Sequence, residues 1–225
     1  MPVKNEDLHG FAPDRSSVVL ILIDVINDLE FPEGKQMYDE ALQMAQCIAD
    51  LKKRAREAGI PIVYVNDNFG RWQSDFRGVV EHCLHDGVLG EPLTKLLAPE
   101  TEDYFVLKPK HSAFFSTTLD VLLEYLQAKT LILTGLAGNI CVLFTANDAY
   151  MRDFDLVVPE DCIASNTPRE NQHALEQMHH VLKADTRRSQ DLDLSQLLRA
   201  ANQAETHSQP HSQPHSQTQS EKAAV

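Results

Sequence analysis

The stretch "TLILTGLAGNICVLFTANDAYM", residues 130–151, reads as a buried strand followed by a helix, with a cysteine at the junction. Residues 130–135 form a continuous apolar run, which is typical of a strand covered on both faces. Small residues follow, and a helical pattern begins near residue 139 with Cys141 in its first turn. A thiol at a helix N-terminus lies near partial positive charge and unpaired N–H groups, so this junction is a candidate catalytic site.

Strands and helices alternate along the rest of the chain. We predict strands at 17–24, 61–66, 103–108, 130–135 and 155–161, and helices at 36–58, 117–127, 139–152 and 167–182, with short helical pieces around 76–85 and 91–97. This alternation predicts an α/β fold of three layers, α/β/α, with a mostly parallel, doubly wound sheet. We assume the strand order 2-1-3-4-5, and "KADTR" (183–187) is a candidate edge strand.

The 225 residues suit one domain with a large core. We expect an irregular N-terminal lead-in at 1–16, the domain at 17–200 and a disordered tail at 201–225. The tail repeats "HSQP", which offers no apolar side chains to a core.

Composition and charge narrow the function classes. The net charge of −13 argues against nucleic acid or an anionic membrane as a partner. No apolar run approaches the roughly 18 residues that span a bilayer, and the N-terminus lacks the apolar segment of a secretory signal. The four cysteines lie far apart without a C-x-x-C pair, so we expect neither a disulfide framework nor a thiol-rich zinc site. A cytoplasmic protein with a small-molecule substrate is the expectation.

Three polar side chains lie at predicted strand ends. Asp24 ends the first strand, Lys108 ends the third, and Cys141 follows the fourth. Ligands bind at the carboxyl ends of strands in open parallel sheets, so the assumed order brings these side chains together. There Lys108 would favour the thiolate, Asp24 could carry a proton to a leaving amine, and backbone N–H groups of the turn could hold an oxyanion.

Each of these residues also has a structural interpretation when it is taken alone. A strand-end carboxylate often caps a helix or pairs with a cation, a strand-end lysine is often a solvated charge, and a cysteine at a helix start often only packs. Their combination favours acyl transfer, but spacing alone leaves both interpretations open.

At these residues the chain resembles the isochorismatase-like cysteine hydrolase superfamily, which includes nicotinamidases and ureidoacrylate amidohydrolases. The matching segments are "LILIDVINDLEFPEG" (20–34), "VLKPKHSAFFSTTLDVLL" (106–123), "LILTGLAGNICVLFTANDAYMRDF" (131–154) and "VVPEDCIAS" (157–165). The resemblance implies a catalytic triad: Asp24 as proton shuttle, Lys108 rather than Lys110 as its electrostatic partner, and Cys141 as nucleophile. It also implies a cis peptide at Leu136–Ala137, with the amides of Ala137 and Cys141 as the oxyanion hole.

The chain departs from nicotinamidases in two places. Ile26 and Leu29 stand where the family has Gln and Phe, which puts in doubt any substrate contact made by those side chains. The region after the second strand, "NDNFGRWQSDF" (66–76), has no histidine for the D-x-H…H metal set of nicotinamidases. We therefore expect no metal and no cofactor, and we do not expect nicotinamide as substrate. True isochorismatases lack the cysteine, so Cys141 also argues against vinyl-ether hydrolysis.

Aromatic and polar residues next to these motifs are candidates for the substrate pocket. They are Asn68, Phe69, Trp72 and Phe114, with Phe115 beside the last. The aromatic residues have core packing as an equal alternative. Arg71 could hold a substrate carboxylate but could equally be a solvated charge. For His111 we expect a supporting or surface role, and for Asp161 and Asn139 a structural one.

These patterns predict a cofactor-independent, cysteine-dependent amidohydrolase that cleaves the C–N bond of a small amide, ureido or carbamoyl compound through a thioester. The alternatives are a hydrolase of another ester or ether bond, a thiol-dependent transferase, and a pseudoenzyme that binds a metabolite or a protein. A flavodoxin-like carrier is disfavoured because no phosphate-binding Gly-rich loop follows the first strand. From the resemblance we expect a homo-oligomer, a dimer or larger.

Overall fold

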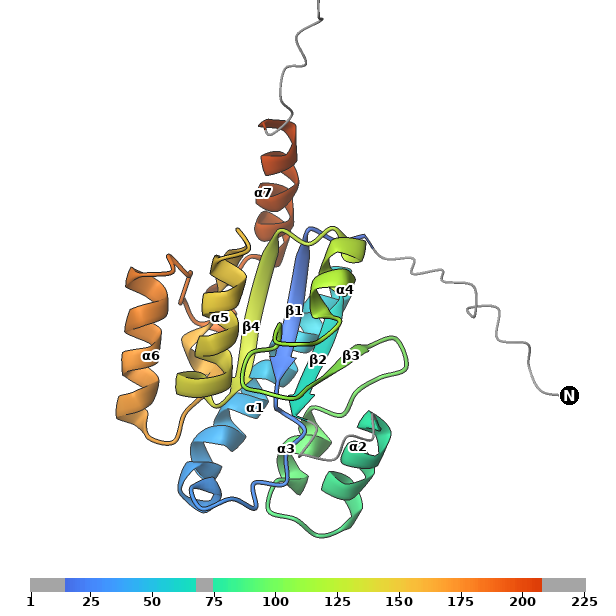
Figure 1. Cartoon of the computed structure of the whole chain (residues 1–225), viewed down its shortest axis with the longest axis vertical. Helices are drawn as coiled ribbons and strands as arrows, with labels where there is room; N and C mark the ends of the chain where they lie inside the picture. Colours follow the sequence, from blue (N-terminus) through green and yellow to red (C-terminus); the bar gives the residue numbers. More distant parts are fainter. Residues whose placement is uncertain (1–14, 68–74, 208–225) are drawn as a thin grey trace, which may run out of the picture.

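A parallel sheet separates two layers of helices, as predicted (Figure 1). The computed structural model describes residues 15–67 and 75–207, and side chains to residue 203. The strands are β1 (Val18–Ile23), β2 (Ile62–Asp67), β3 (Tyr104–Lys108), β4 (Thr130–Leu136), β5 (Asp155–Val157) and β6 (Ile163–Ala164). The helices are α1 (Gly34–Glu57), α2 (Phe76–His85), α3 (Glu91–Leu96), α4 (Leu119–Leu126), α5 (Leu143–Tyr150), α6 (Pro168–His180) and α7 (Leu194–His207).

The order of the strands is β3-β2-β1-β4-β5, with β6 also paired to β4, so the assumed order 2-1-3-4-5 is wrong. β3 lies at the edge beside β2 instead of between β1 and β4. Its burial explains the position, since Phe105 is exposed while every residue of β1 and β4 is buried. An edge strand has one neighbour and tolerates such exposure, whereas a central strand is covered on both sides.

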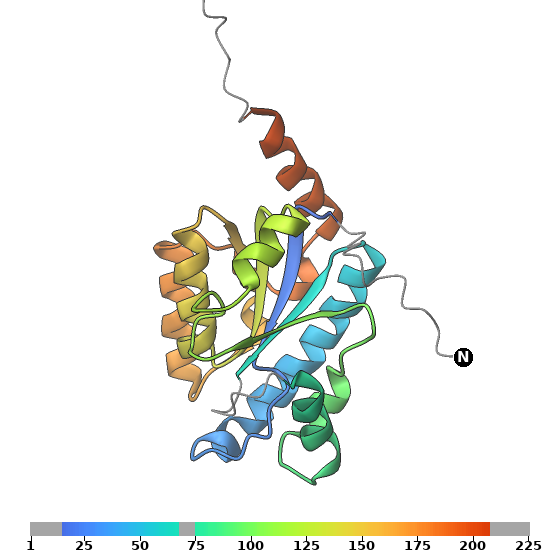
Figure 2. The same ribbon diagram turned by 45° about the vertical axis from the view of Figure 1, so that its right-hand side comes forward.

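The two faces of the sheet carry separate hydrophobic clusters. Alternate residues of β1 point to opposite faces, with Leu20 and Leu22 in one cluster and Val19 and Ile21 in the other. The first face packs on α1, with α2, α3 and α7, and the second face packs on α4, α5 and α6. Figure 2 shows α1 running along one side of the sheet and the pair α5 and α6 on the other. Both faces of β1 are therefore shielded from solvent, as its apolar run predicts.

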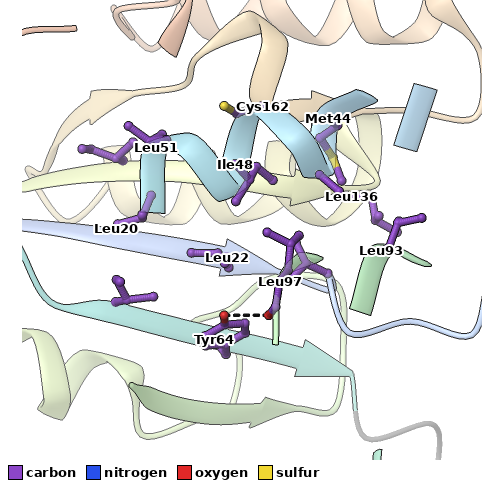
Figure 3. Packing of buried hydrophobic residues seen from close by; sticks show 14 of the residues in the cluster. Leu20, Leu22, Met44, Ile48, Leu51, Tyr64, Leu93, Leu97, Leu136 and Cys162 are labelled. Carbon is purple, nitrogen blue, oxygen red and sulfur yellow. Dashed lines mark hydrogen bonds between the residues drawn. The ribbon is translucent and has the colours of Figure 1, made fainter. Parts of the chain in front are cut away.

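Helix α1 supplies most of the cover on the first face (Figure 3). Its residues Met44, Ile48 and Leu51 belong to one cluster with Leu20 and Leu22 of β1, and Met44 lies beside Leu136 of β4. A fully buried side chain of this type contributes about 1.5–3 kcal/mol through removal from water. Tyr64 of β2 lies in the same layer, and its hydroxyl is satisfied by the carbonyl of Leu97 at 2.8 Å. This cluster stabilises the sheet without Asp24, Lys108 or Cys141.

The predicted helix at 139–152 is divided into two parts. Residues Gly138–Val142 form one π-helical turn, and α5 begins only at Leu143. Cys141 therefore lies in the π-helical turn and not in the first turn of an α-helix. Such turns are rare in proteins and are often found at functional sites.

The chain after β4 also differs in detail from the prediction. β5 ends at Val157, and a 3-10 turn at Glu160–Cys162 leads into β6, which pairs with the last part of β4. The candidate strand at 183–187 makes a single parallel bridge, between Val157 and Asp185. α6 begins as predicted, because Thr167 accepts a hydrogen bond from the Glu170 amide and Pro168 occupies the first turn.

Helix α7 extends beyond the domain boundary expected at residue 200 and ends at His207. Its buried Leu194 and Ala201 pack with the first cluster, while its C-terminal part projects away from the sheet (Figure 1). The lead-in up to residue 14 and the tail from 208 lie outside the described residues. Between residues 15 and 207, apart from 68–74, no helix is both long and apolar enough to span a bilayer.

Candidate active site

The ends of three strands bring Asp24, Lys108 and Cys141 together, as the sequence predicted. Asp24 follows β1, Lys108 is the last residue of β3, and Cys141 lies in the π-helical turn after β4. Lys108 Nζ lies 2.8 Å from Asp24 Oδ2 and 3.5 Å from Cys141 Sγ. The lysine and the aspartate are 0% and 5% exposed, while the cysteine is partly exposed. A buried ion pair thus faces a thiol that solvent can reach.

The end of β2 holds the Asp24 carboxylate in place. Asp24 has a left-handed backbone with φ 51°, and its amide donates to the carbonyl of Val65 at 2.9 Å. Its Oδ1 accepts a hydrogen bond from the amide of Asp67 at 2.7 Å. Oδ2 is left to Lys108, whose Nζ also donates to the Lys110 carbonyl at 3.2 Å. Both carboxylate oxygens are therefore fixed by neighbours on β2 and β3.

The loop that carries Cys141 needs glycine at both of its ends. Gly135 has φ +112°, and a Cβ there would lie 2.0 Å from the Ile23 carbonyl oxygen. A Cβ on Gly138 would lie 2.7 Å from Asn171 Oδ1 and 2.8 Å from Ser165 Oγ. The peptide between Leu136 and Ala137 is cis, at the position that the resemblance implied. The loop therefore packs directly on β1 and on the start of α6.

Ser165 braces this loop from the side of β6. Its hydroxyl oxygen accepts a hydrogen bond from the Asn139 amide at 3.0 Å and donates to Asn171 Oδ1 at 2.7 Å. Ser165 is 1% exposed, so these bonds are not in competition with water. The expected structural role of Asn139 therefore rests on its backbone amide.

A second brace joins Cys141 to the loop after β3. The Thr145 hydroxyl donates to the Cys141 carbonyl at 2.7 Å and accepts from the Ala113 amide at 3.0 Å. Sequence reasoning missed this residue. Its signal was its position four residues after Cys141, where a helical hydroxyl can bond back to the preceding turn.

The charges of the pair are set by burial and by each other. Burial raises the pKa of Asp24 above the usual carboxyl range, and the nearby Lys108 ammonium offsets this only in part. Burial lowers the pKa of Lys108, but Asp24, Cys141 and Asp67 together outweigh it and raise that pKa on balance. The lysine therefore stays charged, and the aspartate is a stronger proton acceptor than an exposed carboxylate.

Lys108 favours the thiolate, as expected, but it does not make Cys141 a thiolate in the resting site. Burial, followed by the charge of Asp24, raises the pKa of the Cys141 thiol to about 12, and Lys108 lowers it only in part. The physical reason is that Lys108 is already paired with Asp24, whose negative charge also faces the sulfur. In the resting site Cys141 is a neutral thiol beside a basic carboxylate.

His111 lies closer to the sulfur than the sequence suggested. Its Nδ1 is 3.8 Å from Cys141 Sγ, on an exposed side chain. The imidazole packs against Phe144 of α5, with ring centroids 5.6 Å apart. This contact has no direct signal in the sequence, because it depends on how the loop after β3 folds over the π-helical turn.

The predicted pocket residues have separate outcomes. Asn68, Phe69, Arg71 and Trp72 lie outside the described residues. Phe114 does not form a pocket wall: it is 4% exposed in the core, where it stacks on Phe154 beneath Arg152. Such packing was the stated alternative.

Three other residues singled out from the sequence have packing or hydrogen-bonding roles in the fold. Ile26 and Leu29 are buried in the first cluster, so these family departures serve packing. Asp161 accepts hydrogen bonds from the amide and the hydroxyl of Ser189, which agrees with a structural role. In the described part of the chain, no three His, Cys, Asp or Glu side chains gather closely enough to hold a metal ion.

Comparisons with known proteins relate the chain to one family of sequences and to several solved structures. The sequence model of the Isochorismatase domain matches residues 18–189. YaaI, an uncharacterized isochorismatase family protein of Bacillus subtilis, is 43% identical over 171 residues, which make up 76% of this chain and 93% of YaaI. The crystal structure of N-carbamoylsarcosine amidase from Thermoplasma acidophilum has 28% identity and a TM-score of 0.63, over 79% of this chain and 99% of that one. Nicotinamidase PncA from Bacillus subtilis has 27% identity and a TM-score of 0.60, over 76% and 99%.

Proposed function

The chain belongs to the isochorismatase family of hydrolases, and we propose that it is a cysteine-dependent amidohydrolase acting on a small amide, ureido or carbamoyl compound. The observation that carries the proposal is the position of Lys108 Nζ, 2.8 Å from Asp24 and 3.5 Å from Cys141. The likeness to an N-carbamoylsarcosine amidase and a nicotinamidase supports cleavage of a C–N bond.

In the first half of the proposed reaction, the Cys141 sulfur attacks the substrate carbonyl carbon while its proton moves to Asp24. The raised pKa of Asp24 suits this transfer, because a more basic carboxylate accepts the proton more readily. Lys108 then faces a developing thiolate at 3.5 Å and stabilises its charge. The amides of Ala137 and Cys141 are the proposed donors to the oxyanion.

Collapse of the tetrahedral intermediate breaks the C–N bond. The proton held by Asp24 passes to the departing nitrogen, which leaves as ammonia or an amine, and a thioester remains on Cys141. Water then attacks the thioester carbonyl, the acid leaves, and the thiol is restored. Asp24, again a carboxylate, is one base available for this second half.

A panel of small amides, ureides and carbamoyl compounds, assayed for release of ammonia or amine, tests the proposal. The wild type should release ammonia or an amine from at least one class of compound. Cys141→Ala should fold normally but show no turnover. Cys47→Ala is the matched control, since Cys47 is also a free, partly exposed thiol but lies on α1. Full activity of Cys141→Ala would overturn the nucleophile assignment.

The same panel separates the alternatives. Release of an acid or an alcohol without ammonia or amine would indicate hydrolysis of an ester or ether bond. Saturable binding without turnover would indicate a pseudoenzyme. We also propose a cytoplasmic location, with which the four free cysteines agree. The resemblance described above supports a homo-oligomer.

A further inference from the structure

Cys141 has titratable partners on two sides. Asp24 and Lys108 face the sulfur from the buried side and are 5% and 0% exposed. His111 faces it from the solvent side, with Nδ1 3.8 Å from Sγ and an exposed side chain. The imidazole therefore lies on the side of the sulfur that solvent can reach.

The loop that carries His111 is fixed at several points, so its position follows from the fold. The Lys110 carbonyl accepts from Lys108 Nζ at 3.2 Å, and the Ala113 amide donates to Thr145 Oγ1 at 3.0 Å. Between them, the Ser112 hydroxyl donates to the Asp148 carboxylate of α5. With its ring against Phe144, the imidazole is held over the nucleophile from both ends of the loop.

We propose that His111 is a catalytic residue of thioester hydrolysis: its Nδ1 takes a proton from the attacking water and returns that proton to the departing Cys141 sulfur. This inference rests on the proposed function, since it concerns the second half of that reaction.

The step is balanced within the site. The water oxygen forms a bond to the thioester carbonyl carbon, and one water proton moves to the neutral Nδ1. The C–S bond then breaks, its electron pair stays on sulfur, and the imidazolium gives its proton back across the Nδ1–Sγ contact of 3.8 Å. The acid leaves, and the thiol and the neutral imidazole are regenerated.

Two features favour His111 over Asp24 in this half-reaction. Asp24 is buried and holds both Lys108 and the Asp67 amide, whereas His111 lies where water enters. The departing sulfur also needs a proton, because burial makes its thiol a weak acid whose pKa is about 12. A base on the solvent side that touches the sulfur meets both needs.

p-Nitrophenyl acetate tests this step without knowledge of the natural substrate, because it acetylates thiols and its leaving group needs no proton. The first burst of p-nitrophenolate measures acylation. After removal of excess reagent, intact mass spectrometry measures how long the acetyl group remains on Cys141. In His111→Gln the burst rate should equal that of wild type, while loss of the acetyl group should slow by roughly 100-fold. A histidine needed only for folding would alter both rates.

His173→Gln is the matched control, because His173 is an exposed histidine on α6 and should retain wild-type kinetics. Equal acetyl lifetimes in wild type and His111→Gln would overturn the inference. Cys141→Ala keeps the two proposals distinct. A burst that survives in that variant removes the proposed nucleophile, whereas a Cys141-dependent burst with unchanged lifetimes removes only the role of His111.

Discussion

Lys108 Nζ lies 2.8 Å from Asp24 Oδ2, although β3 and β1 are not neighbours in the sheet. β2 lies between them, and the lysine side chain crosses its end close to Asp67, whose Oδ2 is 3.9 Å from Nζ. The lysine side chain is long enough to reach Asp24 although their two strands are not adjacent. The amine can therefore be buried beside the thiol while its own strand remains at the edge of the sheet.

The first prediction concerns the stability of this ion pair. Lys108→Met should lower the free energy of unfolding by about 3 kcal/mol at neutral pH, because it leaves a buried carboxylate without its cation. Without the cation the pKa of Asp24 in the folded state rises further above its unfolded value. Protonation at acidic pH then favours the folded state, so the deficit should shrink as the pH falls.

Urea unfolding at neutral and at acidic pH measures both effects. The control is Lys53→Met, which removes an exposed lysine of α1 and should change stability little at either pH. A deficit that stays constant across this pH range would contradict the raised pKa of Asp24.

The second prediction concerns the acid limb of activity. In the proposed mechanism acylation needs Asp24 as a carboxylate, so kcat/KM should fall as the pH drops through the raised pKa of this group. The loss should therefore begin above the pH expected from an ordinary carboxyl pKa of about 3.9. A pH profile on any substrate found in the ammonia screen measures it, and Asp24→Asn should remove turnover at every pH. An acid limb at the ordinary carboxyl pKa would argue against Asp24 as the proton acceptor.

The third prediction concerns the reactivity of the thiol. Because the pKa of Cys141 is about 12, its alkylation by iodoacetamide should be slow at neutral pH and should rise about tenfold per pH unit in alkaline solution. Peptide mapping should show Cys141 labelled before the buried Cys83 and Cys162. A rate that levels off near neutral pH would indicate a stable thiolate and would contradict the neutral resting site.

The fourth prediction concerns the loop braced by Ser165 and Asn171. Gly138→Ala should destabilise the fold by about 1–3 kcal/mol and strongly reduce activity, because its Cβ would collide with both side chains. Gly59→Ala is the control: Gly59 has φ +69° with open space around it, at the end of α1. That variant should lose stability through backbone strain and keep its activity. Melting curves combined with kcat separate the two, and wild-type kcat in Gly138→Ala would show that the brace is not needed.

Apolar runs were sufficient to predict β1 and β4, since these strands have no exposed residue and their sequences are largely hydrophobic. The order of the strands was not predictable in this way. A run such as 103–108 records only that a strand exists, and the exposure of Phe105 that marks β3 as an edge depends on the assembled sheet. The π-helical turn at Cys141 was missed for a similar reason, because its neighbours from β6 and α6 are distant in sequence.

For the site, strand-end chemistry and the motifs predicted which side chains meet: Asp24, Lys108 and Cys141. They did not predict the protonation state of the thiol, which depends on a balance between burial and two opposite charges. They also did not predict the contact between His111 and the sulfur, because the folding of the loop after β3 creates it.

The Thr145 hydroxyl, bonded to both the Cys141 carbonyl and the Ala113 amide, has a consequence for redesign. This one oxygen atom sets the distance between the loop after β3 and the π-helical turn that carries Cys141. Substitutions in the loop after β3 that displace Ala113 will therefore also shift Cys141, so redesign of this loop should vary Thr145 together with it.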